Sequence, residues 1–183
     1  MPVISDGMIT LRPWAPGDAS FLLEASADPA IQRYSLSRSR PVTAVEAQDQ
    51  LRDGAYTLTT DASGRPSGSL VITDAVTGVP LGQCGIDGWS SGDVAQIGYW
   101  LAPKVRGQGI TTRAVVLLAN RLFALGASRV FLTVVEDNDS SIAVAKRAGF
   151  LLEGPSGEQS VWRGRRHEVL VFAVAAEDWK QQR

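Results

Sequence analysis

A glycine-studded corner joins a predicted strand to a predicted helix, and it constrains the fold of this chain more than any other feature. Residues 94–101 read VAQIGYWL, in the manner of a strand, and PKVRGQGITTR follows at 103–113. The run after the corner places apolar side chains on one helical face. A helix N-terminus leaves about four backbone amides without partners and carries roughly half a positive elementary charge. Glycines just before it allow close approach of a ligand, so the corner is expected to bind phosphate oxygens.

A plain tight turn and two well-known nucleotide motifs are the alternatives to this interpretation of the corner. Tight turns between a strand and a helix also use glycine for backbone freedom alone. Lys104, Arg106 and Arg113 place positive charge around the corner, which favours the phosphate. A P-loop would need a lysine after Gly109, and the dinucleotide motif would need a glycine where Thr112 stands. The expected phosphate is therefore not bound as ATP or NAD is bound in those motifs.

The remaining chain alternates between predicted strands and helices without strict order. The predicted strands are 8–14, 69–76, 80–89, 94–101, 129–135 and 168–174, and the predicted helices are 16–26, 41–53, 111–125 and 140–148. We expect Gly126 and Gly149 to end the last two helices, and Asp139 or Ser140 to cap the final one. No repeat or linker divides the 183 residues. One α/β (α+β) domain is therefore expected over residues 1–183, with a mixed sheet and helices on both faces.

Composition argues against several classes of protein. The net charge of −1 gives no bulk attraction to nucleic acid or to an anionic membrane. No apolar run approaches the roughly 20 residues that span a bilayer, and the N-terminal residues do not resemble a signal peptide, so a cytoplasmic protein is expected. The chain has one cysteine, Cys84, and one histidine, His167. This composition disfavours an intrachain disulfide, a His-based metal site and a nucleophilic triad, and we expect no metal.

The corner resembles the acyl-CoA-binding motif of the GNAT superfamily of N-acetyltransferases, [Q/R]-x-x-G-x-[G/A]. The matching residues are Lys104-Val105-Arg106-Gly107-Gln108-Gly109, and Lys104 departs from the motif while keeping a positive charge. Six segments in order resemble one branch, the RimJ/RimL-type enzymes that acetylate ribosomal-protein N-termini: 9–22, 27–34, 82–86, 97–115, 138–150 and 163–174. The resemblance implies the GNAT fold, with a mostly antiparallel sheet of about six to seven strands.

The resemblance also implies acetyl-CoA as donor and a primary amine as acceptor. In this family the corner holds the coenzyme A pyrophosphate and the preceding strand, often bulged, pairs with the pantetheine arm. Gly98 fits such a bulge. Asn138 would contact the arm and Ser141 would lie near the thioester sulfur, although both could equally be helix caps. Donor binding is thus assigned to Tyr99, Trp100, Leu101, Lys104, Val105, Arg106, Gly107, Gln108, Gly109, Ile110, Thr111, Asn138 and Ser141.

Acyl transfer needs an oxyanion donor, an acid for the departing thiolate and a neutral amine. Backbone amides of residues 99–101 could serve the oxyanion, and Ser141 or Tyr99 could protonate the thiolate. Many relatives place a carboxylate where this chain has Gln96. Glu136 is therefore the candidate base, with Asp87 and Asp93 as alternatives.

The acceptor is expected near Arg33, Tyr34, Trp89 and Gln96, and the arginine-rich segment 33–40 shapes this region in relatives. The acceptor could be a protein N-terminus or a small-molecule amine, including an antibiotic. The donor could be acetyl-CoA or succinyl-CoA. A sensor that binds acyl-CoA without turnover is the alternative from a different class. Homodimers are common in this branch, so a homodimer is also left open.

Overall fold

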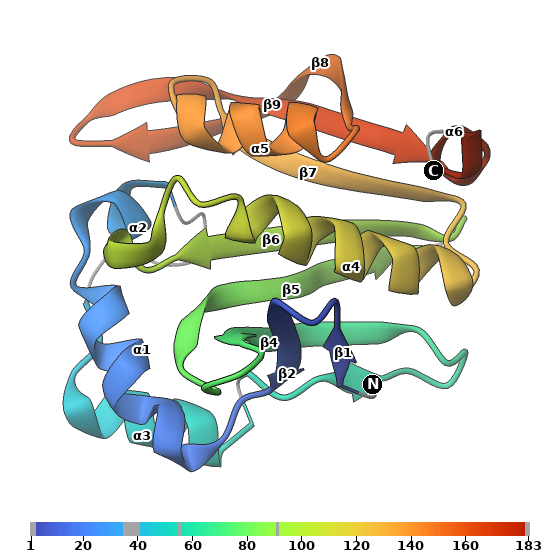
Figure 1. Ribbon diagram of the computed structural model, residues 1–183. Helices are drawn as coiled ribbons and strands as arrows, with labels where there is room; N and C mark the ends of the chain where they lie inside the picture. The colour runs from blue at the N-terminus through green and yellow to red at the C-terminus, as the bar shows by residue number, and fades with distance from the viewer. Residues whose placement is uncertain (1–2, 35–40, 55, 91, 182–183) are drawn as a thin grey trace.

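The computed structural model describes residues 3–34, 41–54, 56–90 and 92–181. One nine-stranded sheet runs in the order β1-β2-β4-β5-β6-β7-β9-β8, and β3 pairs with β4 (Figure 1). The strands are β1 (Ile4–Ser5), β2 (Ile9–Pro13), β3 (Thr59–Thr60), β4 (Pro66–Asp74), β5 (Pro80–Ser90), β6 (Val94–Leu101), β7 (Arg129–Val135), β8 (Leu151–Trp162) and β9 (Arg165–Ala175). The α-helices are α1 (Ala19–Ser26), α2 (Pro29–Tyr34), α3 (Ala44–Arg52), α4 (Ile110–Ala124), α5 (Asp139–Arg147) and α6 (Ala176–Gln181), and the 3-10 helices are η1 (Pro16–Asp18) and η2 (Pro103–Val105).

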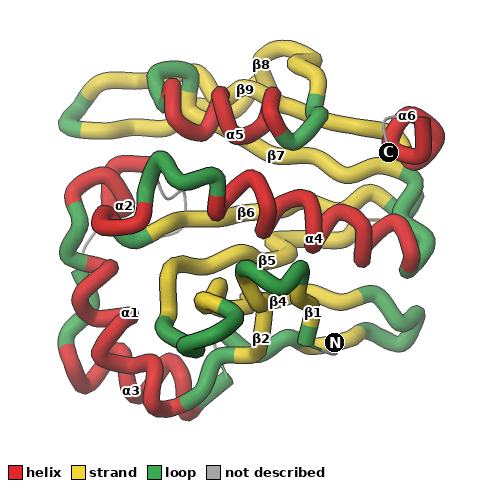
Figure 2. The backbone as a smooth tube through the Cα atoms, in the orientation of Figure 1, coloured by secondary structure: helices red, strands yellow, loops and turns green. Residues whose placement is uncertain are grey.

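Helices cover both faces of the sheet, as Figure 2 shows for α4 and α5 on the nearer face. Side chains alternate between faces along a strand. On β6, Ala95, Ile97 and Leu101 pack in the main core with α4. Trp100 points to the opposite face, where it packs against the core of α1 and α3. The mixed sheet with helices on both faces is therefore confirmed.

Strands β6 and β7 are the parallel pair in an otherwise antiparallel sheet of the described residues. Their pairing covers only Val94–Gln96 and Arg129–Phe131. Both strands continue beyond these residues, β6 to Leu101 and β7 to Val135, and they diverge as they do so (Figure 1). The sheet is thus split between the C-terminal halves of its two central strands.

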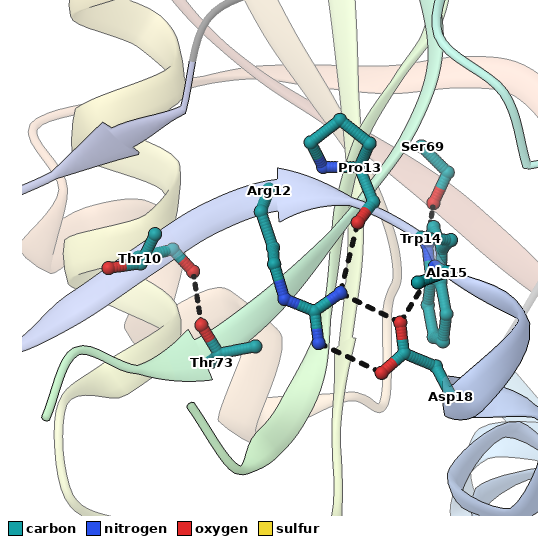
Figure 3. Close-up of polar contacts among 8 residues, drawn as sticks. All are labelled: Thr10, Arg12, Pro13, Trp14, Ala15, Asp18, Ser69 and Thr73. Carbon is teal, nitrogen blue, oxygen red and sulfur yellow. Dashed lines mark hydrogen bonds and ion pairs between the residues drawn. The ribbon is translucent and has the colours of Figure 1, made fainter. Parts of the chain in front are cut away.

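A half-buried ion pair fixes the chain where it leaves the sheet for the first helices (Figure 3). The Arg12 guanidinium donates to both carboxylate oxygens of Asp18, at 2.8 Å each, and the Ala15 amide donates to the same carboxylate at 2.9 Å. Trp14 Nε1 donates to Ser69 Oγ on β4 at 3.1 Å. These contacts join β2, η1 and β4, and they set the start of α1.

Several local predictions need correction. The sheet contains more strands than expected, because β1, the two-residue β3 and β8 add to the six predicted strands. The irregularity expected around Gly98 in β6 lies instead in the partner strand β5, where the register shifts between Ile86 and Gly88. The cap of α5 is Asn138, whose side chain accepts from the Ser141 amide, rather than Asp139 or Ser140. No described helix has the length and apolarity that crossing a membrane would require.

Candidate active site

A cleft of about 340 Å³ passes through the sheet where β6 and β7 diverge. It is lined by residues 97–101 of β6, 133–135 of β7, 106–107 and 109–112 around the start of α4, 30, 31 and 34 of α2, and 138, 140, 141, 143, 144 and 147 around α5. Consecutive residues of a strand point to opposite faces, so the lining of β6 and β7 reaches both sides of the sheet. The backbone of β6 beyond Gln96 has no ladder partner on its β7 side. The cleft therefore exposes a free strand edge that an extended molecule could pair with.

The N-terminus of α4 opens into this cleft without a side-chain cap. The N-cap is Gly109, and the first backbone bond of the helix runs from the Arg113 amide to the Gly109 carbonyl at 3.1 Å. The amides of residues 110–112 therefore lack intrahelical acceptors. Gly107 and Gly109 have φ of 77° and 76°, a left-handed conformation that favours glycine. Open space lies where their side chains would be, so an anion can approach the backbone closely.

The basic side chains of the corner are paired with carboxylates that lie far away in sequence. Lys104 Nζ lies 3.2 Å from Glu24, Arg106 lies 2.7 Å from Asp28, and Arg113 lies 2.7 Å from Asp6. Arg106 also donates to the Leu101 carbonyl at 3.0 Å. An anion at this corner would therefore meet free backbone amides, while these cations already have carboxylate partners.

A further cation, Arg147, comes from the last turn of α5 and lines the cleft. It forms no ion pair with any described residue. Its position beside the corner leaves it available to a phosphate.

Asn138, Ser141 and Tyr99 meet on one wall of the cleft. Asn138 is buried, and its Oδ1 accepts from the Ser140 hydroxyl at 2.8 Å and the Ser141 amide at 3.2 Å. The Tyr99 hydroxyl donates to the Ser141 carbonyl at 3.3 Å, and burial raises the pKa of that hydroxyl. The Ser141 hydroxyl has no bond to a described residue, so it remains free to act on a ligand.

Of the predicted acceptor residues, Tyr34 lines the cleft, and Gln96 lies on β6 immediately before the lining residues 97–101. Gln96 Nε2 donates to Thr133 Oγ1 at 3.0 Å, which ties β6 to β7 where the strands begin to separate. Tyr34 lines the cleft from α2, and its hydroxyl donates to the Asp137 carbonyl at 3.3 Å. Arg33 lies behind it and forms an ion pair with the Asp137 carboxylate. The part of segment 33–40 after Tyr34 lies outside the described residues.

Other predicted residues lie outside the cleft lining. Among the motif residues these are Lys104, Val105 and Gln108, whereas Tyr99, Trp100, Leu101, Arg106, Gly107, Gly109, Ile110 and Thr111 line it. Trp89 packs against the main core. The Glu136 carboxylate accepts from the Glu168 amide at 3.1 Å, and Asp93 pairs with Arg65 at 2.7 Å. Sequence reasoning missed Ala30 and Ile31 of α2 and residues 133–135 of β7, for which apolar strand and helix patterns were the only signal.

Residues 8–151 match the family model described as acetyltransferase (GNAT) domain. This match covers most of the chain, which therefore belongs to the GNAT acetyltransferase domain family. A Bacillus subtilis (strain 168) protein, provisionally named ribosomal N-acetyltransferase YdaF, is 32% identical over 90 residues. The match spans 49% of each chain, so this chain covers about half of that relative's length.

Two solved structures resemble the whole fold. RimL, a ribosomal L7/L12 α-N-protein acetyltransferase in complex with coenzyme A, superposes with a TM-score of 0.78 at 20% identity and covers 95% of this chain and 98% of its own. The microcin C7 self-immunity acetyltransferase MccE, in complex with acetyl-CoA and AMP, gives a TM-score of 0.76 at 22% identity over 93% of each chain. At these identities the likeness shows the GNAT fold.

Proposed function

We propose that this chain, as a single domain over residues 1–183, transfers an acetyl group from acetyl-CoA to a primary amine in the cytoplasm. The observation that carries the proposal is the split between β6 and β7 with the uncapped N-terminus of α4 at its mouth. A ligand with a phosphorylated end and an extended arm fits this shape. Membership of the acetyltransferase (GNAT) domain family supports the same activity.

The two ends of the cleft would hold different parts of acetyl-CoA. The free amides of residues 110–112 suit the pyrophosphate, with Arg147 as a nearby cation. The unpaired edge of β6 at 97–101 suits the amide groups of the pantetheine arm, as a strand edge suits a peptide. Asn138 uses its Oδ1 to cap α5, which leaves its side-chain nitrogen to donate to the arm.

Transfer requires the amine nitrogen to attack the thioester carbonyl carbon, forming the C–N bond while the C–S bond breaks. Backbone amides of residues 99–101 would stabilise the oxyanion. The Ser141 hydroxyl would protonate the departing thiolate, because Tyr99 already donates to the Ser141 carbonyl. Glu136, the candidate base from sequence, binds the Glu168 amide and would have to leave it to reach an amine.

The acceptor is proposed to be a protein N-terminal α-amine or a small-molecule amine of similar pKa, bound beside Tyr34 and Gln96. Neutralising a lysine side chain at pH 7 costs about 4.6 kcal/mol, against about 1 kcal/mol for an α-amine. A site with a single weak base tolerates the smaller cost better. The names of YdaF and RimL support a protein N-terminus, and that of MccE supports a small molecule.

Amine-dependent release of the coenzyme A thiol tests the proposal. Purified protein would be assayed with acetyl-CoA or succinyl-CoA against N-terminal peptides, Nα-blocked lysine peptides and small amines, with mass spectrometry to locate the acyl group. We expect acetylation of α-amines or small amines. Tight binding of acetyl-CoA without release for any amine would instead indicate a sensor, and faster modification of lysine side chains would refute the proposed acceptor class.

A further inference from the structure

Strand β5 carries one extra residue at the point where the cleft begins on the neighbouring strand. Ile86 pairs with Ile97 and Gly88 pairs with Gln96, so two consecutive residues of β6 face three residues of β5. Asp87 is the inserted residue. A bulge of this kind turns a side chain away from its regular direction and is frequent next to active sites. The direction of the Asp87 side chain therefore does not follow from the regular alternation of side chains along β5.

The Asp87 carboxylate lies across the backbone of Gly98. A Cβ added to Gly98 would overlap the carboxylate, and no other atom is among its three nearest neighbours. Gly98 itself lines the cleft. By alternation, its missing side chain would point to the face of Gln96 and Trp100, opposite α4. The carboxylate thus lies on the face of the sheet opposite α4, over Gly98, which lines the cleft, although Asp87 itself is not part of the lining.

Asp87 is also unlike the other aspartates near the cleft. Asp28 and Asp137 form ion pairs with Arg106 and Arg33. No described residue donates a hydrogen bond to Asp87 or forms an ion pair with it. Asp87 is exposed to solvent, yet the neighbouring strands partly desolvate its carboxylate and raise its pKa. An unpaired carboxylate with weakened hydration is a better proton acceptor than a paired one.

We propose that Asp87 is the general base that removes a proton from the acceptor ammonium group on this face of the cleft. The inference rests on the proposed acetyl transfer. The Asp87 carboxylate takes one proton from the ammonium, leaving a neutral amine and a carboxylic acid. The amine then attacks the thioester, the C–N bond forms, and the C–S bond breaks. The thiolate receives a proton from Ser141, the second amine proton restores the Ser141 hydroxyl through solvent, and Asp87 returns its proton to solvent.

Removal of the carboxylate is the first test. Asp87→Asn should lower kcat/KM for the amine by at least about 10²-fold, the usual minimum for a general base. The dissociation constant for acetyl-CoA, measured by calorimetry, should change by less than about twofold, or about 0.4 kcal/mol. Asp178→Asn is the matched control, because Asp178 is exposed on α6 at the far end of the molecule from α2 (Figure 1). If Asp87→Asn is as active as this control, the proposal is wrong.

Displacement of the carboxylate is the second test. Gly98→Ala keeps Asp87 but forces its flexible end to move, which the fold can accommodate. It should lower kcat/KM in the wild-type background. In the Asp87→Asn background the effect should be less than about twofold, because both changes remove the same proton acceptor. An equal loss in both backgrounds would refute the role of Asp87. A wild-type protein that binds acetyl-CoA but acetylates no amine would refute the proposed acetyl transfer, and the role of Asp87 as its base with it. An active wild type with an equally active Asp87→Asn variant would refute only the role of Asp87.

Discussion

At the scale of single residues, Asn138 serves two purposes that substitutions can separate. Its Oδ1 caps α5, and its side-chain nitrogen remains for a ligand. Asn138→Asp keeps the cap but cannot donate, so it should preserve the melting temperature and raise the KM for acetyl-CoA. Asn138→Ala should show the same change in KM and also lose about 1 kcal/mol of stability. Thermal unfolding and initial rates check both; an unchanged KM in either variant would leave Asn138 as a cap alone.

Ser141 and Tyr99 compete for the role of acid, and their hydrogen bonds predict which is used. The Ser141 hydroxyl is free of described partners, whereas the Tyr99 hydroxyl donates to the Ser141 carbonyl. Ser141→Ala should lower kcat by about 10²-fold or more with little change in stability. Tyr99→Phe should cost about 1 kcal/mol of stability and affect kcat less. A larger loss of kcat in Tyr99→Phe would reverse the assignment.

Charge pairing at the corner could not be predicted from the sequence. The basic residues Lys104, Arg106 and Arg113 suggested a cationic site, yet each has a carboxylate partner from the first 28 residues of the chain. These pairs depend on how α1 and β1 lie against the start of α4. Local sequence carries no information on such contacts. The glycines were predictable because their backbone conformation is a local property.

At the scale of elements, the start of α4 combines an unusual backbone conformation with an open approach. Gly109→Val places a β-branched residue at φ 76°, which should cost about 1–2 kcal/mol and weaken acetyl-CoA binding at least tenfold, or about 1.4 kcal/mol. Asparagine tolerates this conformation. Gly109→Asn should therefore fold normally and still bind more weakly, because its side chain fills the space beside the amides. Calorimetry checks this, and wild-type affinity in Gly109→Asn would contradict the close approach.

Strand β8 shows why one element was not predicted. Its sequence LLEGPSGEQSVW contains Gly154, Pro155 and Gly157, which usually indicate a turn. Pairing with β9 overrides this local preference, and the register shifts twice along the pair to accommodate it. The partner β9 was predicted because its regular apolar pattern faces the core on one side. Elements with a consistent local pattern were thus predictable, and an irregular edge strand was not.

At the scale of the whole molecule, stability should depend on pH through Asp18. Burial opposes ionisation of this carboxyl, but the hydrogen bonds from Arg12 and Ala15 outweigh it and lower its pKa below the usual value. The stabilisation is therefore complete above the unfolded-state pKa of about 3.9 and is lost as the pH falls through the folded-state value. Asp18→Asn should lose about 3 kcal/mol near neutral pH, since it leaves Arg12 without its partner.

Urea unfolding of the wild type and Asp18→Asn, repeated from neutral pH down to about pH 2, would measure this dependence. The difference in free energy of unfolding between the two should shrink as the solution becomes acidic. Asp53→Asn is the control, because Asp53 is exposed at the end of α3. A difference that stays constant with pH would show that Asp18 is not the responsible group.

The fold class followed from the sequence because alternation of strands and helices is local, and the six motifs identified the family. The resemblance implied that the strand before the corner pairs with the pantetheine arm, but no local pattern shows where the cleft begins, because that depends on where the parallel pairing of β6 and β7 stops. The sequences VAQIGYWL and RVFLTVV contain no signal that the pairing of β6 with β7 ends at Gln96 and Phe131. The inserted Asp87 is equally invisible in sequence, since a bulge is defined only against its partner strand.

Hydrogen–deuterium exchange with and without acetyl-CoA tests the central claim most directly, because it reports on backbone amides. Exchange should slow on binding at residues 97–101, the free edge of β6, and at residues 107–112, the uncapped start of α4. Amides of β6 that already pair with β5 should change little. Binding of acetyl-CoA with no protection at either segment would contradict the account.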